Sequence, residues 1–226
     1  MSKHPTELPF DWNRHFVYSK DGTKCLGACA LMAVKYWGID LSNEDCHRIL
    51  SQLAVPAFEG ADAGQVVKAV EHVIGEATET NEDDLGVKLD RFFTDEGAVT
   101  KAPLTSPRAP IKQEFFHARR VDTLRAALSV SKAIPQIVIY DEVLATYHEE
   151  SPGGHACIVQ KLDFDANLVY LIDPNIQARR TPTYYTFDDF ERGWRAFEQA
   201  TCIIYPRDLY HTVRSVVATS VLGARP

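Results

Sequence analysis

The sequence predicts an α+β fold in which an N-terminal helical half packs on a C-terminal antiparallel β-sheet. Helical patterns fill the chain between residues 26 and 75, and strand patterns separated by turn residues dominate from residue 135 onwards. The chain has 226 residues and a hydrophobic content of 45%, which is enough for one core. We therefore expect residues 1–226 to form a single domain.

Three helices are predicted before residue 76. Leu26–Trp37 is apolar almost all round, which indicates a buried helix, and Gly38 suits its C-terminal end. Ser42 has an acid three residues later, at Asp45, which is typical of a helix start, and this second helix should end near Leu53. A third helix is indicated by apolar residues at helical spacing at positions 66, 67, 70, 73 and 74.

The later half of the chain is predicted to form mainly strands. Strands are predicted at Pro135–Tyr140, His155–Leu162, Leu168–Ile172 and Thr201–Tyr205. The polar turn 163–167 joins the middle two. Short helices are predicted at 122–130 and from Thr186 through Trp194. Consecutive strands joined by short turns favour antiparallel pairing.

Residues 76–118 differ from the rest of the chain. They begin with the acidic run 76–84 and continue with prolines at 103, 107 and 110. A short helix at Leu85–Phe93 and a strand at Gly97–Val99 fit the pattern, and the remainder is predicted to be an insertion or a lid loop.

Charge and cysteine usage exclude several classes of protein. The formal net charge of −7 argues against a nucleic-acid-binding surface. The five cysteines include no CxxC pair, so the sequence predicts no metal and no cofactor, and their odd number favours a reducing compartment. Neither a signal-peptide core nor an 18-residue apolar stretch is visible, so we expect a cytoplasmic protein that does not bind membranes.

Cys25 is the candidate nucleophile because it stands at the start of the predicted buried helix. A thiol is mostly protonated at neutral pH, and a helix N-terminus or a nearby imidazolium favours the thiolate. Cys29, one helical turn later, would lie inside the apolar face, where a thiolate is desolvated. The alternative is that both cysteines are small core residues.

His155 and Asp173 could complete a catalytic group with Cys25. His155 follows two glycines and opens an apolar strand, and Asp173 ends the next strand before Pro174. His155 lies 130 residues after Cys25, within the separation of about 130–150 residues typical of papain-like cysteine hydrolases. An acid in this position can orient the imidazole. Alternatively, His155 is a structural histidine and Asp173 a turn residue.

These residues resemble the C39 and C39-like peptidases, a group of papain-like cysteine proteases that includes bacteriocin leader-peptide processing domains. The family opens with a segment like DCGxACLxM, and here Lys24–Met32 (KCLGACALM) keeps both cysteines, the alanine and the methionine in register. The later order also matches: a strand after Pro135, Gly154-His155, a polar turn and Asp173-Pro174. The resemblance implies a papain-like fold with Cys25 as nucleophile, His155 as general base and acid, and Asp173 as orienting residue.

The sequence departs from this family around the oxyanion site. Family members usually carry a glutamine about six residues before the cysteine, where this chain has Ser19. Ser19, Asn13 or Tyr18 could donate to the oxyanion instead. The family's aspartate before the cysteine is Lys24 here, and Trp194 is a candidate for an aromatic cleft residue beside His155.

Three functions remain open from the sequence. The first is a cysteine peptidase or isopeptidase that acts on a peptide or protein substrate through a thioester. The second is an acyltransferase or transglutaminase-like enzyme that uses the same thiolate, and the third is a degenerate peptide-binding module. No transporter domain accompanies the segment, so a stand-alone protein is expected. Nothing in the sequence indicates the oligomeric state.

Overall fold

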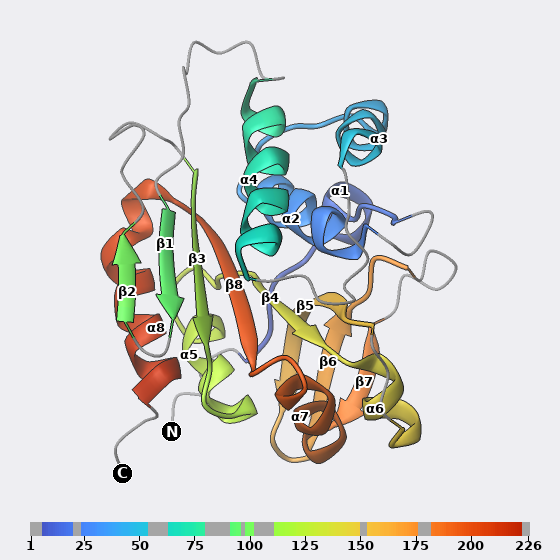
Figure 1. The fold of residues 1–226 in the computed structure, drawn as a ribbon, viewed down its shortest axis with the longest axis vertical. Helices are drawn as coiled ribbons and strands as arrows, with labels where there is room; N and C mark the ends of the chain where they lie inside the picture. The colour runs from blue at the N-terminus through green and yellow to red at the C-terminus, as the bar shows by residue number, and fades with distance from the viewer. Residues whose placement is uncertain are drawn as a thin grey trace.

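The late strands form a single mixed β-sheet, and the early helices cover part of it (Figure 1). In this computed structural model the described residues are 6–19, 24–53, 63–79, 91–95, 98–101, 111–149, 153–175 and 182–222. Within them, helices dominate before residue 80 and strands after residue 90, which confirms the predicted α+β class.

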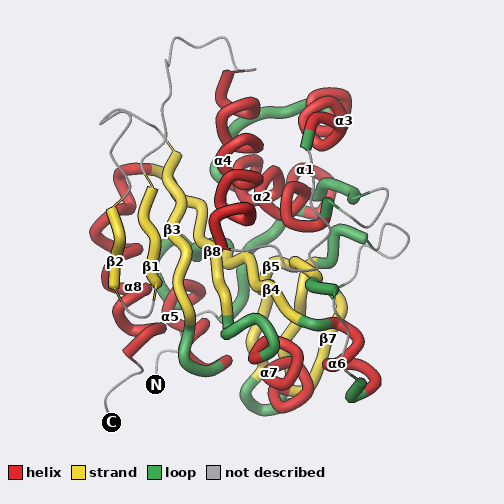
Figure 2. Tube along the Cα trace, viewed as in Figure 1, coloured by secondary structure: helices red, strands yellow, loops and turns green. Residues whose placement is uncertain are grey.

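The sheet has eight strands in the order β2-β1-β3-β8-β4-β5-β6-β7, drawn in yellow in Figure 2. Their bounds are β1 Arg91–Asp95, β2 Ala98–Lys101, β3 Ile111–His117, β4 Gln136–Tyr140, β5 His155–Asp163, β6 Leu168–Ile172, β7 Thr183–Thr186 and β8 Ala200–Pro206. Neighbouring strands are antiparallel except β1 and β3, which are parallel. The four strands predicted after residue 134 are β4, β5, β6 and β8.

Helix α2 (Cys25–Tyr36) lies at the centre of the helical half. All its residues from Cys25 to Lys35 are buried, because it packs between the other N-terminal helices and strands β4, β5 and β8. This position explains why the helix is apolar on every side. It ends where Gly38 adopts a φ of +94°, a conformation that glycine adopts without strain.

The other N-terminal helices surround α2. They are α1 (Trp12–His15), α3 (Asn43–Gln52) and α4 (Ala63–Glu79). Helix α3 begins with the predicted cap: the Ser42 hydroxyl accepts from the Asp45 N–H at 3.0 Å, and the Asp45 carboxylate accepts from the Ser42 N–H at 3.2 Å. The cap fixes the direction in which α3 leaves the preceding loop.

Shorter helices flank the sheet. They are the 3₁₀ turns η1 (Val121–Leu124) and η2 (Arg207–Leu209), with α5 (Arg125–Leu128), α6 (Glu142–Tyr147), α7 (Phe187–Arg195) and α8 (Tyr210–Leu222). Helix α8 packs against β3, β8, η1 and α5, and its Ser220 hydroxyl donates to the Thr123 carbonyl at 3.2 Å. No helix in the described ranges is both long and apolar enough to cross a bilayer.

The segment 76–118 contributes three strands at one end of the sheet. The predicted strand at Gly97–Val99 corresponds to β2, but Arg91–Phe93, predicted to be helical, belong to β1. Residues 85–90 of that predicted helix lie outside the described residues. The assignment of the whole segment as an insertion or a lid stays a prediction.

Gly27 of α2 lies against two leucine side chains at the end of α3. A Cβ atom at this position would lie 2.4 Å from Leu53 Cδ1 and 3.0 Å from Leu50 Cδ2. The helices therefore pack more closely here than an alanine would allow without movement of both leucine side chains.

We expect Gly27→Ala to lower the free energy of unfolding by about 1–3 kcal/mol, because the extra methyl group overpacks this contact. Gly75→Ala is the matched control, since Gly75 is also helical and nothing lies within 4 Å of its Cβ position. That variant should be neutral or stabilised by up to about 1 kcal/mol through helix propensity. Urea unfolding of both variants tests this, and equal effects at the two sites would contradict the packing argument.

Candidate active site

The first turn of α2 is joined to β5 through the backbone of Ala156. The Ala156 N–H donates to Cys25 Sγ at 3.4 Å, and the Cys29 thiol donates to the Ala156 carbonyl at 3.3 Å. Cys25 and Cys29 are one turn apart and so share a face of the helix. The pairing of β5 with β6 ends at Ile158 and Ile172, two residues away from Ala156. The backbone N–H and C=O of Ala156 are therefore not used by β6 and can bond to α2.

His155 is the residue next to this contact and faces Asp173. It is the first residue of β5 and pairs with Tyr140 of β4. Its Nε2 lies 3.0 Å from Asp173 Oδ1, and the same oxygen accepts from the Asn175 N–H at 2.8 Å. Because Nε2 donates to the carboxylate, the other ring nitrogen, Nδ1, is available to exchange a proton with a thiol.

The pKa of His155 lies well above the ordinary histidine value. Burial alone would lower it, but the Cys157 sulfur, the hydrogen bond to Asp173 and hydrogen-bonding contacts with Cys157 and Cys25 outweigh burial. Burial raises the pKa of Cys157 to about 11, so Cys157 is a neutral thiol at pH 7. We therefore infer that the negative charge that stabilises the protonated imidazole of His155 is that of the Asp173 carboxylate.

Cys157 is a member of this site that the sequence did not suggest. It lies two residues after His155 on β5, so the two side chains share one face of the strand. Continuing the register of Ile158 with Ile172 by one residue places Cys157 opposite Asp173. The ligating atoms of the three side chains all lie within 4.8 Å of one another, and the Cys157 sulfur is 3.7 Å from the Tyr140 hydroxyl. Because side chains alternate between the two faces of a strand, the position two residues after His155 could have been identified from the sequence.

Tyr140 places an aromatic ring beside His155. The Tyr140 and His155 rings are 5.8 Å apart between centroids. Trp194 is fully buried in α7, stacks on Phe190 and donates its indole N–H to the Ala200 carbonyl at 3.1 Å. Trp194 therefore exposes no surface in this structure, and its expected place beside His155 stays a prediction.

Ser19, one of the three candidate oxyanion donors, is hydrogen-bonded next to the acid end of the site. Its N–H donates to the Pro174 carbonyl at 2.8 Å, directly after Asp173. Ser19 is 2% exposed, and its hydroxyl has no hydrogen-bond partner within the described part of the chain. A buried hydroxyl without a partner is costly, which is consistent with a donor held for a ligand.

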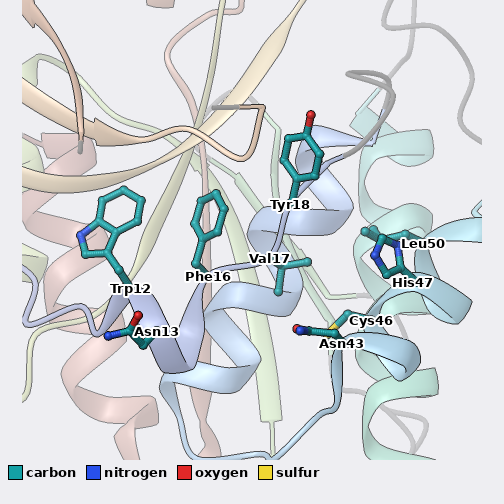
Figure 3. Close-up of a pocket in the computed structure, with 9 residues that line it drawn as sticks. All are labelled: Trp12, Asn13, Phe16, Val17, Tyr18, Asn43, Cys46, His47 and Leu50. Carbon is teal, nitrogen blue, oxygen red and sulfur yellow. The ribbon is translucent and has the colours of Figure 1, made fainter. Parts of the chain in front are cut away.

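Asn13 and Tyr18 instead line a pocket of about 220 Å³ between the α1 region and α3 (Figure 3). The other lining residues are Trp12, Phe16, Val17, Asn43, Cys46, His47 and Leu50. None of Cys25, His155 and Asp173 lines this pocket. Asn13 and Tyr18 therefore line this pocket and Ser19 does not, although the sequence grouped the three residues together.

The solved structures that resemble this chain include the following two. One is the peptidase domain of Streptococcus ComA, a bifunctional ABC transporter involved in a quorum-sensing pathway, with 14% identity and a TM-score of 0.49 over 86% of this chain and 99% of that one. The other is a double-glycine-motif protease from an AMS/PCAT transporter in complex with the leader peptide, with 12% identity and a TM-score of 0.45 over 91% and 96%. No protein-family model and no curated protein matches the sequence.

Three buried cysteines of the folded protein should not react with an alkylating reagent. Burial raises the pKa of Cys29 and Cys202 well above the ordinary thiol value and that of Cys157 to about 11, so all three stay protonated at pH 7.5. We expect iodoacetamide to leave these three unmodified in native protein and to modify them in urea. Peptide mapping by mass spectrometry measures this, and native labelling of Cys29 or Cys157 would contradict the burial that we describe.

Proposed function

We propose that this protein is a cysteine hydrolase that cleaves peptide or isopeptide bonds, with Cys25 as nucleophile, His155 as general base and acid, and Asp173 as the orienting residue. The observation that carries the proposal is the position of the Cys25 sulfur. It accepts from the Ala156 N–H at 3.4 Å and contacts the imidazole of His155, which is bonded to Asp173. Nucleophile, base and orienter in mutual contact are the signature of nucleophilic catalysis.

The geometry supports acylation of Cys25 in the first half of the reaction. The thiolate attacks the carbonyl carbon and forms a tetrahedral oxyanion. The C–N bond then breaks, the protonated His155 Nδ1 gives its proton to the departing amine, and a thioester remains on Cys25. Asp173 keeps Nε2 protonated throughout, so that Nδ1 is the nitrogen that exchanges the proton.

Hydrolysis of the thioester completes the cycle. His155 accepts a proton from water, whose oxygen attacks the thioester carbon, and the carboxylic acid leaves as the C–S bond breaks. The oxyanion of both steps would be stabilised by the Cys25 N–H at the start of α2 and by the Ser19 hydroxyl. We further propose a peptide or protein substrate and a reducing, cytoplasmic setting, which suits five free cysteines.

An activated ester tests the nucleophile without knowledge of the natural substrate. We expect the 4-nitrophenyl ester of N-acetyl-glycylglycine to acylate wild-type Cys25, with release of nitrophenolate and an adduct that hydroxylamine removes. Cys25→Ala should form no adduct, and His155→Ala should slow acylation by about 10²–10⁴-fold, the usual contribution of a general acid–base group. Cys46→Ala is the matched control, because Cys46 is a buried cysteine on another helix.

A folded wild-type protein that forms no adduct at Cys25 would overturn the enzymatic proposal. It would favour a peptide-binding module that keeps the fold, a candidate suggested by Ser19 at the position where the resembled family has glutamine. A stable adduct that disappears only when an amine is added would instead indicate acyl transfer.

Ser19→Ala should lower the acylation rate by up to about 10²–10³-fold if this hydroxyl is an oxyanion donor. Asn13→Ala and Tyr18→Phe should leave the rate close to that of wild type, because both residues line the separate pocket. Stopped-flow release of nitrophenolate gives the rates, and circular dichroism checks folding. Equal rates for wild type and Ser19→Ala would remove Ser19 from the mechanism.

A further inference from the structure

His155, Cys157 and Asp173 bring a nitrogen, a sulfur and an oxygen ligand to one point on the sheet. Their ligating atoms lie within 4.8 Å of one another, and all three side chains are buried. Among the described residues, no other group of three or more histidine, cysteine or acidic side chains is gathered in this way. The pair His155 and Asp173 is accounted for by the proposed hydrolase, but Cys157 has no role in it.

The donor set matches the preferences of Zn²⁺. This ion takes thiolate, imidazole and carboxylate ligands in a tetrahedron, at about 2.0–2.3 Å from the metal. Such bond lengths place the ligand atoms about 3.3–3.8 Å from one another. His155 Nε2 and Asp173 Oδ1 are already 3.0 Å apart, and no other pair has to approach by more than about 1–1.5 Å. Side-chain rotation can supply this change, because both hydrogen bonds of Asp173 described above use Oδ1 and leave Oδ2 to turn toward the metal.

Charge balance also favours a divalent cation at this point. A neutral imidazole, the Cys157 thiolate and the Asp173 carboxylate together carry two negative charges, which Zn²⁺ neutralises. A buried group of charges is tolerated when its charges are compensated and its lone pairs are used. Binding releases the Cys157 proton and any proton on the imidazole nitrogen that becomes a ligand, so no oxidant or other reactant is needed.

Cys25 lies on the other side of the imidazole. Nε2 of His155 faces Asp173, whereas Nδ1 is the nitrogen that exchanges a proton with the Cys25 thiol in the proposed hydrolase. The three ligands therefore leave one position of the tetrahedron open, which a water molecule can take.

We propose that the side chains of His155, Cys157 and Asp173 form an inhibitory Zn²⁺ site, because bound metal takes from Cys25 the base and the acid that orients it. Cys157 distinguishes this site from a bare histidine–aspartate pair, because it adds a thiolate ligand. The metal site follows from the ligand geometry alone and goes beyond the proposed hydrolase activity, so either proposal can fail without the other.

Cobalt and zinc titrations of the whole chain test the proposal directly. We expect one equivalent of Co²⁺ to give thiolate charge-transfer absorption near the ultraviolet edge and visible bands of a tetrahedral site, and Zn²⁺ to displace it. Zn²⁺ should also slow the labelling of Cys25 by iodoacetamide, because bound metal removes the imidazolium beside the thiol, and EDTA should restore the rate. Removing a residue that only hydrogen-bonds to a metal ligand weakens metal binding about 10–100-fold. Cys157→Val removes a ligand itself, so it should weaken zinc binding at least about tenfold.

The matched control is Cys202→Val, which removes an equally buried thiol from β8. It should bind Zn²⁺ like wild type, and circular dichroism and thermal unfolding establish that both variants are folded. No cobalt spectrum in wild type would overturn the proposal. Unchanged zinc affinity in a folded Cys157→Val variant would also overturn it, because the metal would then be held by Cys25 and His155 without the buried thiol.

Discussion

The arrangement of the site depends on one contact, in which the backbone of Ala156 is held between two cysteines of α2. The Cys25 sulfur accepts from its N–H and the Cys29 thiol donates to its carbonyl, at 3.4 and 3.3 Å. These bonds satisfy two buried backbone groups at the point where β6 ends, and they fix the first turn of α2 against the start of β5. Since His155 begins β5, the contact brings the candidate nucleophile and base together across a separation of 130 residues in the sequence.

The second constraint is that the charged pair His155 and Asp173 is buried away from water. His155 is 6% exposed and Asp173 is 3% exposed, so removing either partner would leave a buried charge, at a cost of about 3–5 kcal/mol. Because the pKa of His155 is raised in the folded state, its protonation stabilises the fold fully below the unfolded pKa of about 6.5, and this contribution is lost as pH rises through the higher folded pKa. The site therefore keeps an imidazolium next to Cys25 near neutral pH.

Much of this arrangement was visible in the sequence because it is local. The buried helix, its start at Cys25, the Ser42 cap and the strands that carry His155 and Asp173 follow from periodicity and turn residues. Cys157 and Tyr140 were missed because their positions beside His155 and Asp173 arise from pairing between strands. The proposed metal ligands have no CxxC spacing, because the pairing of β5 with β6 brings them together. The surroundings of Trp194 likewise depend on the packing of α7, which the sequence does not specify.

The most direct test of the central claim, that Asp173 and Cys25 surround a charged His155, is the pH titration of the His155 ring nitrogens by ¹⁵N NMR. Wild type should titrate with a pKa above the ordinary value of about 6.5, and Asp173→Asn should titrate at a lower pKa than wild type. Removal of the Cys25 contact in Cys25→Ala should also lower this pKa. A wild-type pKa at or below 6.5, unchanged in Asp173→Asn, would contradict the account, because burial without a charged partner gives that result.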